Sequence, residues 1–220
     1  MKKRKVSYWL IALLTMGLLA GCSDTPNEQP TDAGSGTAQQ QDEDEQQMND
    51  LDEIEVEFDS DFTDDYKEYA VITATDDSGK ILWERETDKY EATELDRVTE
   101  LGTYEERYYY VEGGTVVALN LSDGSVIWEN TEFDGASPEF DYGEDGTLYL
   151  CGYYGPDFFA VDSDGNTLKR IQTFDEDYYW ACDIICEDDE VIVTLEGGLE
   201  ETEVDVAVSL QDYSYRLIED

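Results

Sequence analysis

The residue types that most often carry chemistry are unevenly represented in this chain. Histidine, the commonest general base and metal ligand, is absent, whereas there are 56 aspartates and glutamates, among which no catalytic pair stands out. Asp162, Asp164 and Asn166 place oxygen atoms at alternate positions, a spacing that suits a hard cation such as calcium. A hairpin turn explains the same residues, because Gly165 comes at the fourth place rather than the sixth place of a calcium loop.

Three cysteines in the second half of the chain, Cys151, Cys182 and Cys186, are the other reactive groups. An odd number allows one internal disulfide at most, so a bridge from Cys151 to either of the others remains open. Burial as small hydrophobic side chains is the simpler reading, since Cys182 and Cys186 lie in an apolar stretch. A structural zinc site is disfavoured without histidine or a fourth cysteine nearby.

Aromatic residues gather in three runs, Tyr108–Tyr110, Tyr153–Tyr154 and Tyr178–Trp180. Neighbours in a strand face opposite ways, so we expect about half of each run in the core and half exposed or at a sheet edge. Exposed rings on a rigid sheet can hold a peptide, a partner protein or a sugar. Tyr153 and Tyr154, in a loop rich in glycine and proline, are therefore the candidate binding surface.

The N-terminal segment has the pattern of a secretory leader over residues 1–21, with basic residues Lys2–Lys5 before a short apolar run. Its end, Leu19-Ala20-Gly21-Cys22, resembles the lipobox of bacterial lipoproteins, in which the cysteine carries a diacylglyceryl group. The resemblance implies lipidation of Cys22 and attachment to the extracytoplasmic face of a bacterial cell membrane. Residues 22–50 have almost no apolar side chains, so we expect a disordered acidic linker before a domain over 51–220.

The net charge of the chain excludes some classes of binding partner. A formal net charge of −43 at pH 7 repels nucleic acid, which excludes a basic-groove binder. The acidic group Asp59, Asp61, Asp64 and Asp65 is interpreted as solvated linker. Weak calcium binding by some acidic group remains open, but no cofactor is indicated.

One hairpin pattern recurs along the domain. A strand ending in a small residue is followed by a polar turn with Gly79, Gly124 or Gly165, and then by a second apolar strand. The second strand carries Trp83 in the first copy and Trp128 in the second. A fourth copy, over residues 207–217, has lost both the glycine and the tryptophan.

This repeat resembles that of the pyrroloquinoline-quinone-type (PQQ-like) β-propellers over roughly residues 54–220. In that family the tryptophan of one blade docks against the next, which would make Trp83 and Trp128 blade-docking residues. The turn glycines Gly79, Gly124 and Gly165 would supply positive φ angles.

The expected fold is all-β, a partial or small β-propeller of about four blades of antiparallel strands, with a β-sandwich as the alternative. Four copies do not close the six- to eight-bladed rings typical of the family, so the assembly is open or two chains complete a ring as a homodimer. The sequence supplies no recognisable set of residues for the cofactor and calcium of the family's quinone-dependent dehydrogenases, so we expect a non-catalytic module. The resemblance implies that this module binds or scaffolds an unknown protein partner. The alternatives are an enzyme, either a degenerate quinoprotein or a carboxylate-dependent hydrolase, and a calcium- or salt-responsive acidic surface protein.

Overall fold

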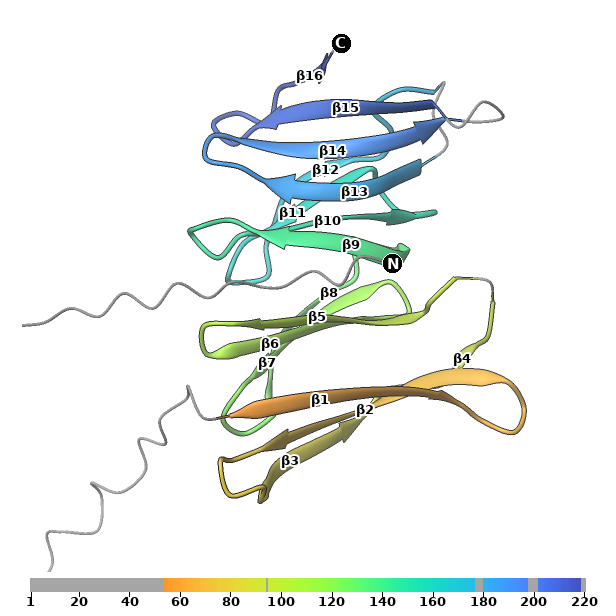
Figure 1. The fold of residues 1–220 in the computed structure, drawn as a ribbon, viewed down its shortest axis with the longest axis vertical. Coiled ribbons are helices and arrows are strands. Elements are labelled where there is room, and N and C mark those ends of the chain that lie inside the picture. The colour runs from red at the N-terminus through yellow and green to blue at the C-terminus, as the bar shows by residue number, and fades with distance from the viewer. Residues whose placement is uncertain (1–53, 94, 177–179, 198–201, 219–220) are drawn as a thin grey trace, which may run out of the picture. The chain divides into compact units, whose positions relative to one another are not determined.

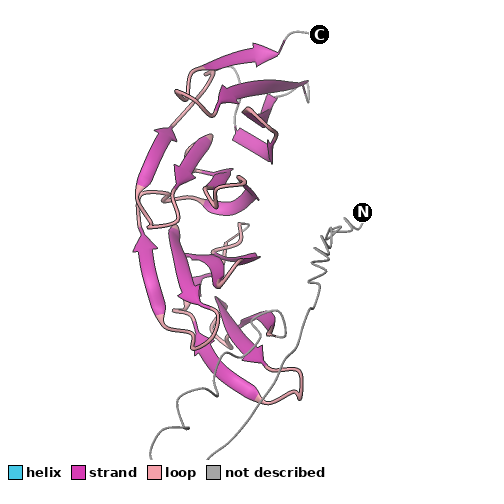
Figure 2. Cartoon of the chain, turned by 90° about the vertical axis from the view of Figure 1, so that its left-hand side faces the viewer, coloured by secondary structure: helices cyan, strands magenta, loops and turns pink. Residues whose placement is uncertain are grey.

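The computed structural model describes residues 54–93, 95–176, 180–197 and 202–218 (Figure 1). Every element in these ranges is a β-strand (Figure 2). The leader, Cys22 and the acidic linker lie outside the described residues. Within the described ranges no helix is long and apolar enough to cross a membrane.

In the described part of the chain, sixteen strands form four antiparallel sheets that follow one another in sequence (Figure 1). The first sheet contains β1 (Glu55–Phe62), β2 (Lys67–Thr75), β3 (Ile81–Glu86) and β4 (Tyr90–Glu91). The second contains β5 (Val98–Tyr104), β6 (Arg107–Glu112), β7 (Thr115–Asn120) and β8 (Val126–Asn130). The third contains β9 (Ala136–Tyr142), β10 (Leu148–Tyr153), β11 (Phe158–Val161) and β12 (Thr167–Ile171). The fourth contains β13 (Trp180–Cys186), β14 (Glu190–Gly197), β15 (Thr202–Ser209) and β16 (Tyr215–Ile218).

Four sheets of neighbouring strands, rather than two stacked layers, confirm the predicted all-β architecture of propeller-type blades. Strands that follow one another in sequence pair in space, which short turns permit. The first sheet differs in one respect, because β3 and β4 both pair with β2 and so fill a single strand position.

Three apolar cores lie between successive sheets. The first joins Ile72 and Trp83 to Tyr108, Tyr110 and other residues of the second sheet. The second core lies between the second and third sheets, and the third core between the third and fourth. None of the three cores, as far as the described residues go, joins the first sheet to the fourth.

The tyrosine run of β6 corrects one expectation. Tyr108, Tyr109 and Tyr110 are all buried in an inner strand, whereas the sequence predicts about half of the run exposed or at a sheet edge. The side chains do alternate, since Tyr108 and Tyr110 belong to the first core and Tyr109 to the second. Both faces of the second sheet are covered by a neighbouring sheet, so alternation exposes neither set.

Each of the first two sheets places a tryptophan on the hairpin turn of the next sheet. The indole N–H of Trp83 donates to the carbonyl oxygen of Leu121 at 2.8 Å, and that of Trp128 donates to Ser163 at 3.0 Å. The rings lie against turn glycines at positive φ: a Cβ on Gly124 would be 2.7 Å from Trp83, and one on Gly165 would be 2.6 Å from Trp128.

The contact between the third and fourth sheets is built differently. The residue that aligns with the two tryptophans is Lys169, and the turn of the fourth sheet holds Tyr213 at φ 56° in place of glycine. The ring of Tyr213 packs back onto Phe158 of the third sheet, with centroids 6.2 Å apart. An aromatic residue of the turn therefore supplies the contact that a strand tryptophan supplies elsewhere.

We predict that Gly165→Ala destabilises the domain more than Gly79→Ala. Both glycines have positive φ, so both substitutions share a strain of about 1 kcal/mol. Only Gly165 meets a tryptophan ring, because nothing lies within 4 Å of a Cβ built on Gly79. Overpacking should add roughly 1 to 3 kcal/mol to the loss for Gly165→Ala in urea unfolding. Equal losses for the two variants would contradict the docking role of the turn.

Candidate functional site

The three weak metal candidates form a closed hydrogen-bonded turn. One carboxylate oxygen of Asp162 accepts the backbone N–H groups of Asp164 at 2.9 Å and Asn166 at 2.8 Å. The side-chain amide of Asn166 donates to the same carboxylate, so it presents hydrogen atoms rather than its oxygen. Burial alone would raise the pKa of Asp162, but these hydrogen bonds together lower it. The three residues do not converge as ligands.

The other acidic hairpin turns use their carboxylates in the same way. Asp76 accepts hydrogen bonds from the backbone and hydroxyl of Ser78, Asp123 from those of Ser125, and Asp212 from those of Ser214. These bonds lower the pKa of each carboxyl. Among the described residues, no group of three or more acids or cysteines is placed to hold a metal ion.

The three cysteines of the domain are free thiols. Cys151 is buried in the core between the third and fourth sheets, where desolvation raises its pKa. Cys182 and Cys186 are half-buried, and burial followed by nearby carboxylates raises the pKa of each to about 11. Such thiols are poor nucleophiles at neutral pH, because the thiolate is the reactive form.

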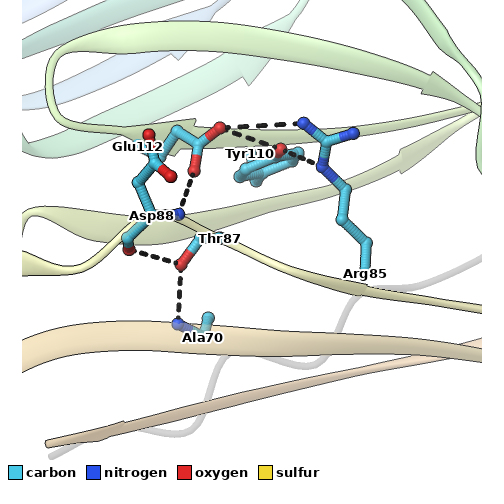
Figure 3. A network of polar contacts seen from close by, with 6 residues as sticks. All are labelled: Ala70, Arg85, Thr87, Asp88, Tyr110 and Glu112. Carbon is cyan, nitrogen blue, oxygen red and sulfur yellow. Dashed lines mark hydrogen bonds and ion pairs between the residues drawn. The ribbon is translucent and has the colours of Figure 1, made fainter. Parts of the chain in front are cut away.

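A polar network joins the first and second sheets (Figure 3). The Nε–H of Arg85 donates to the hydroxyl of Tyr110 at 2.8 Å, and this hydroxyl lies 3.2 Å from a carboxylate oxygen of Glu112. The other carboxylate oxygen of Glu112 accepts a hydrogen bond from the backbone N–H of Asp88. The hydroxyl oxygen of Thr87 accepts a hydrogen bond from the backbone N–H of Ala70. Desolvation raises the pKa of Tyr110. Each group bonds to another within the network, so the arrangement fixes the interface rather than supplying a reactive group.

The candidate binding residue Tyr153 meets an aromatic partner from the fourth sheet. Tyr153 ends β10, Trp180 begins β13, and their rings stack with centroids 5.1 Å apart and an angle of 29°. The indole N–H of Trp180 donates to Glu196 at the end of β14, at 3.2 Å. Tyr154 follows at φ 57° and is 89% exposed. We call Tyr153, Tyr154 and Trp180 the aromatic ledge.

The loop that contains Tyr153 and Tyr154 packs closely against neighbouring backbone. A Cβ on Gly152 would lie 2.8 Å from the carbonyl oxygen of Ala136, and one on Gly155 would lie 2.8 Å from the Cα of Gly135. The side-chain amide of Gln172 also donates to the carbonyl oxygen of Gly155 at 2.9 Å. Only glycine permits the two close approaches, so the loop presents Tyr153 and Tyr154 from a fixed position.

The carboxylate of Glu196 lies against one side of the aromatic ledge. Burial, then Glu196, then Cys182 raise the pKa of Tyr153. Glu196 and Glu203 act with burial to raise the pKa of Cys182 as well. The rings therefore combine a broad apolar surface with adjacent carboxylates. The sequence pattern indicates the aromatic residues but not Glu196, because no feature of the sequence distinguishes Glu196 from the other acidic residues. Tyr178 and Tyr179, from the same predicted run as Trp180, lie outside the described residues.

The fold and the inter-sheet contacts define a β-propeller-type protein of four blade-like sheets. The sequence matches no described protein family and no curated protein. Among solved structures, the chain is similar to streptogramin B lyase, with a TM-score of 0.45 and 12% sequence identity. The similarity covers 76% of this chain and 59% of the lyase chain, so the present chain spans less than two thirds of its length.

We predict that the thiols of the folded domain react slowly with Ellman's reagent. A pKa of about 11 instead of 9.0 lowers the thiolate fraction of Cys182 and Cys186 at pH 8 by about a hundredfold. The measurement uses a chain with Cys22→Ser, and the same chain in guanidinium chloride serves as control. Reaction of the native chain at the unfolded rate would contradict the burial of these thiols.

Proposed function

We propose that this chain is a bacterial surface lipoprotein whose PQQ-like β-propeller repeats form a non-catalytic module that binds a protein partner. The tryptophan-on-glycine contacts at Gly124 and Gly165 support the assignment to this repeat type, since they follow the family's blade-docking pattern. The lipobox-like segment ending at Cys22 supports anchoring to the extracytoplasmic face of the membrane.

The observation that carries the binding function is the aromatic ledge. Tyr153 and Trp180 stack, and Tyr154, the next residue along the chain, is exposed in a loop held by two glycines. Rigid aromatic residues give a large contact area at a low cost in conformational entropy, as at protein interfaces. Burial raises the pKa of Tyr153 and of the neighbouring thiol of Cys182, so neither group is suited to nucleophilic attack at neutral pH.

The partner should present cationic side chains to the aromatic ledge. Aromatic faces bordered by carboxylates attract ammonium and guanidinium groups. The chain already makes such contacts internally, with Arg85 5.9 Å from the ring centre of Tyr110 and Lys89 5.2 Å from that of Tyr69. The net charge of −43 also favours encounter with a basic partner over an acidic one.

We predict that Tyr154→Ala weakens binding of a short arginine-rich peptide about fivefold, which corresponds to one cation–π contact of about 1 kcal/mol. Tyr66→Ala is the matched control, because Tyr66 is also a tyrosine at positive φ (61° against 57°) and is 77% exposed. Fluorescence anisotropy with a glutamine peptide of equal length measures the charge requirement. An equal effect of the two substitutions would overturn the role of the aromatic ledge.

We also predict that Cys22→Ser abolishes membrane attachment when the chain is expressed in a bacterium with its own leader. Two acyl chains add about 0.8 kcal/mol of membrane affinity for each buried methylene, and serine cannot accept the thioether-linked lipid. The unsubstituted chain should partition into the detergent phase of Triton X-114, and the variant into the aqueous phase. Cys182→Ser is the control and should partition like the unsubstituted chain. Detergent partitioning of the Cys22→Ser chain would contradict lipidation at this residue.

A further inference from the structure

The recurring hairpin fixes the position of each strand within its sheet. In the second, third and fourth sheets the hairpin joins the third strand to the fourth, as β7–β8, β11–β12 and β15–β16. In the first sheet the corresponding hairpin, with Gly79 in its turn, joins β2 to β3. By this alignment β2 is a third strand and β1 is a second strand, so no described residues fill the first position of the first sheet.

The registers of the strand pairs support this alignment independently. Every pairing of a first with a second strand contains a register shift, namely in β5–β6, β9–β10 and β13–β14. The pairings of second and third strands, such as β6–β7 and β14–β15, run without a shift. The pairing of β1 with β2 is also continuous over eight residue pairs from Glu55 to Phe62. Its register is therefore that of a second strand with a third.

The unfilled position leaves β1 at the edge of the first sheet and its apolar face partly uncovered. First strands elsewhere bury residues completely or nearly so, for example Leu101 in β5 and Ile184 in β13. In β1, Val56 and Phe58 are only half-buried against the first core. An edge strand also presents backbone N–H and C=O groups that lack strand partners on that side.

The charge of β1 decides which strand can occupy the edge. Glu55, Glu57, Asp59 and Asp61 are exposed and alternate with Val56, Phe58 and Ser60. A second copy of β1 would bring carboxylates opposite carboxylates, which is destabilising. The preceding residues 42–45, Asp-Glu-Asp-Glu, would do the same. A strand with basic residues at alternate positions would instead pair each carboxylate with a cation.

A shallow hollow beside this edge has the lining that a cationic side chain needs. It has a volume of about 340 Å³ and is lined by Asp59, Ser60, Asp61, Tyr69 and Val71. The ammonium group of Lys89 already lies 5.2 Å from the ring centre of Tyr69. Because Lys89 already occupies this ring, an amine on an incoming strand would meet the carboxylates of Asp59 and Asp61 here.

We propose that the edge of β1 binds a strand of a partner protein, about seven residues long, in which lysine or arginine alternates with apolar residues. The length is that of β5, β9 and β13, which fill this position in the other sheets. The basic side chains face Glu55, Glu57, Asp59 and Asp61, and the apolar ones extend the surface formed by Val56 and Phe58. Backbone hydrogen bonds to β1 supply affinity, and the alternating side chains supply specificity.

The test uses the full chain and a synthetic seven-residue peptide that alternates lysine and valine, with a glutamate–valine peptide as its counterpart. Hydrogen exchange should show slower exchange of β1 amides on addition of the lysine peptide and no change with the glutamate peptide. Exchange unchanged by the lysine peptide would overturn the proposal. Slow exchange of the β1 edge in the free chain that is lost on deletion of residues 23–50 would overturn it too, because the chain's own segment would then fill the position.

Charge reversal separates this site from general attraction to an acidic protein. Glu57→Lys combined with Asp59→Lys should weaken binding of the lysine peptide at least tenfold. Glu187→Lys combined with Asp188→Lys, at exposed positions of the turn between β13 and β14, changes the net charge by the same amount and should change affinity less than twofold. Equal losses for the two double variants would overturn the proposal. If the β1 variant fails to fold, as thermal melting would show, the hydrogen-exchange result on the unsubstituted chain decides alone. Neither result depends on the aromatic ledge, so each proposal can fail without the other.

Discussion

No sheet of this protein can bury its apolar surface alone, and the contact of each sheet with the next determines the rest of the structure. A single antiparallel sheet with one solvated face gives too little core, as in other repeat architectures. In β6, Tyr108 and Tyr110 lie in the first core and Tyr109 lies in the second, so the second sheet packs against both of its neighbours. The tryptophan contacts at Gly124 and Gly165 fix how closely successive sheets approach.

Two of the few arginines of the chain form hydrogen bonds at these inter-sheet contacts. Fewer basic side chains are then left to offset the exposed carboxylates. Arg85 bonds to Tyr110 across the first interface, and Arg107 donates to the carbonyl oxygen of Ser163 across the second. Turn carboxylates such as those of Asp76 and Asp162 accept hydrogen bonds from their own turns. Other carboxylates of the described strands, such as those of Glu57 and Glu84, are exposed, so a basic segment is the chemistry that complements the surface.

The sequence predicted those features that are encoded locally. The hairpins can be predicted from the sequence because a turn glycine and the apolar strand after it lie within about ten residues of each other. Asp59 and Asp61 were interpreted as solvated linker, yet they belong to β1: their side chains are exposed while Val56 and Phe58 on the same strand face the core. The pairing of Tyr153 with Trp180 and Glu196 joins three separate segments, and single-sequence patterns carry no signal for such contacts. The sequence also does not predict that Tyr213 takes the place of a docking tryptophan. This aromatic residue belongs to the turn of the fourth sheet, on the other side of the interface from the strand that carries tryptophan in the earlier sheets.

One face of the first sheet and one face of the fourth are not covered by any other described residues, and these two faces bear on whether copies of this chain complete a ring. Ala70, Ile72 and Ala74 face the first core, so the opposite face of the first sheet carries the registered residues Glu57, Thr73 and Glu84. On the fourth sheet, Val193 and Leu195 face the core, and the opposite face pairs Thr194 with Asp205 and Glu196 with Glu203. Closing a ring by apposing these two faces would bring carboxylates together in a poorly hydrated interface, where like charges repel strongly. Salt screens charges buried at an interface much less than exposed charges, so this repulsion would persist at high ionic strength. The same repulsion opposes coverage of either face by the other face of a second copy of the chain.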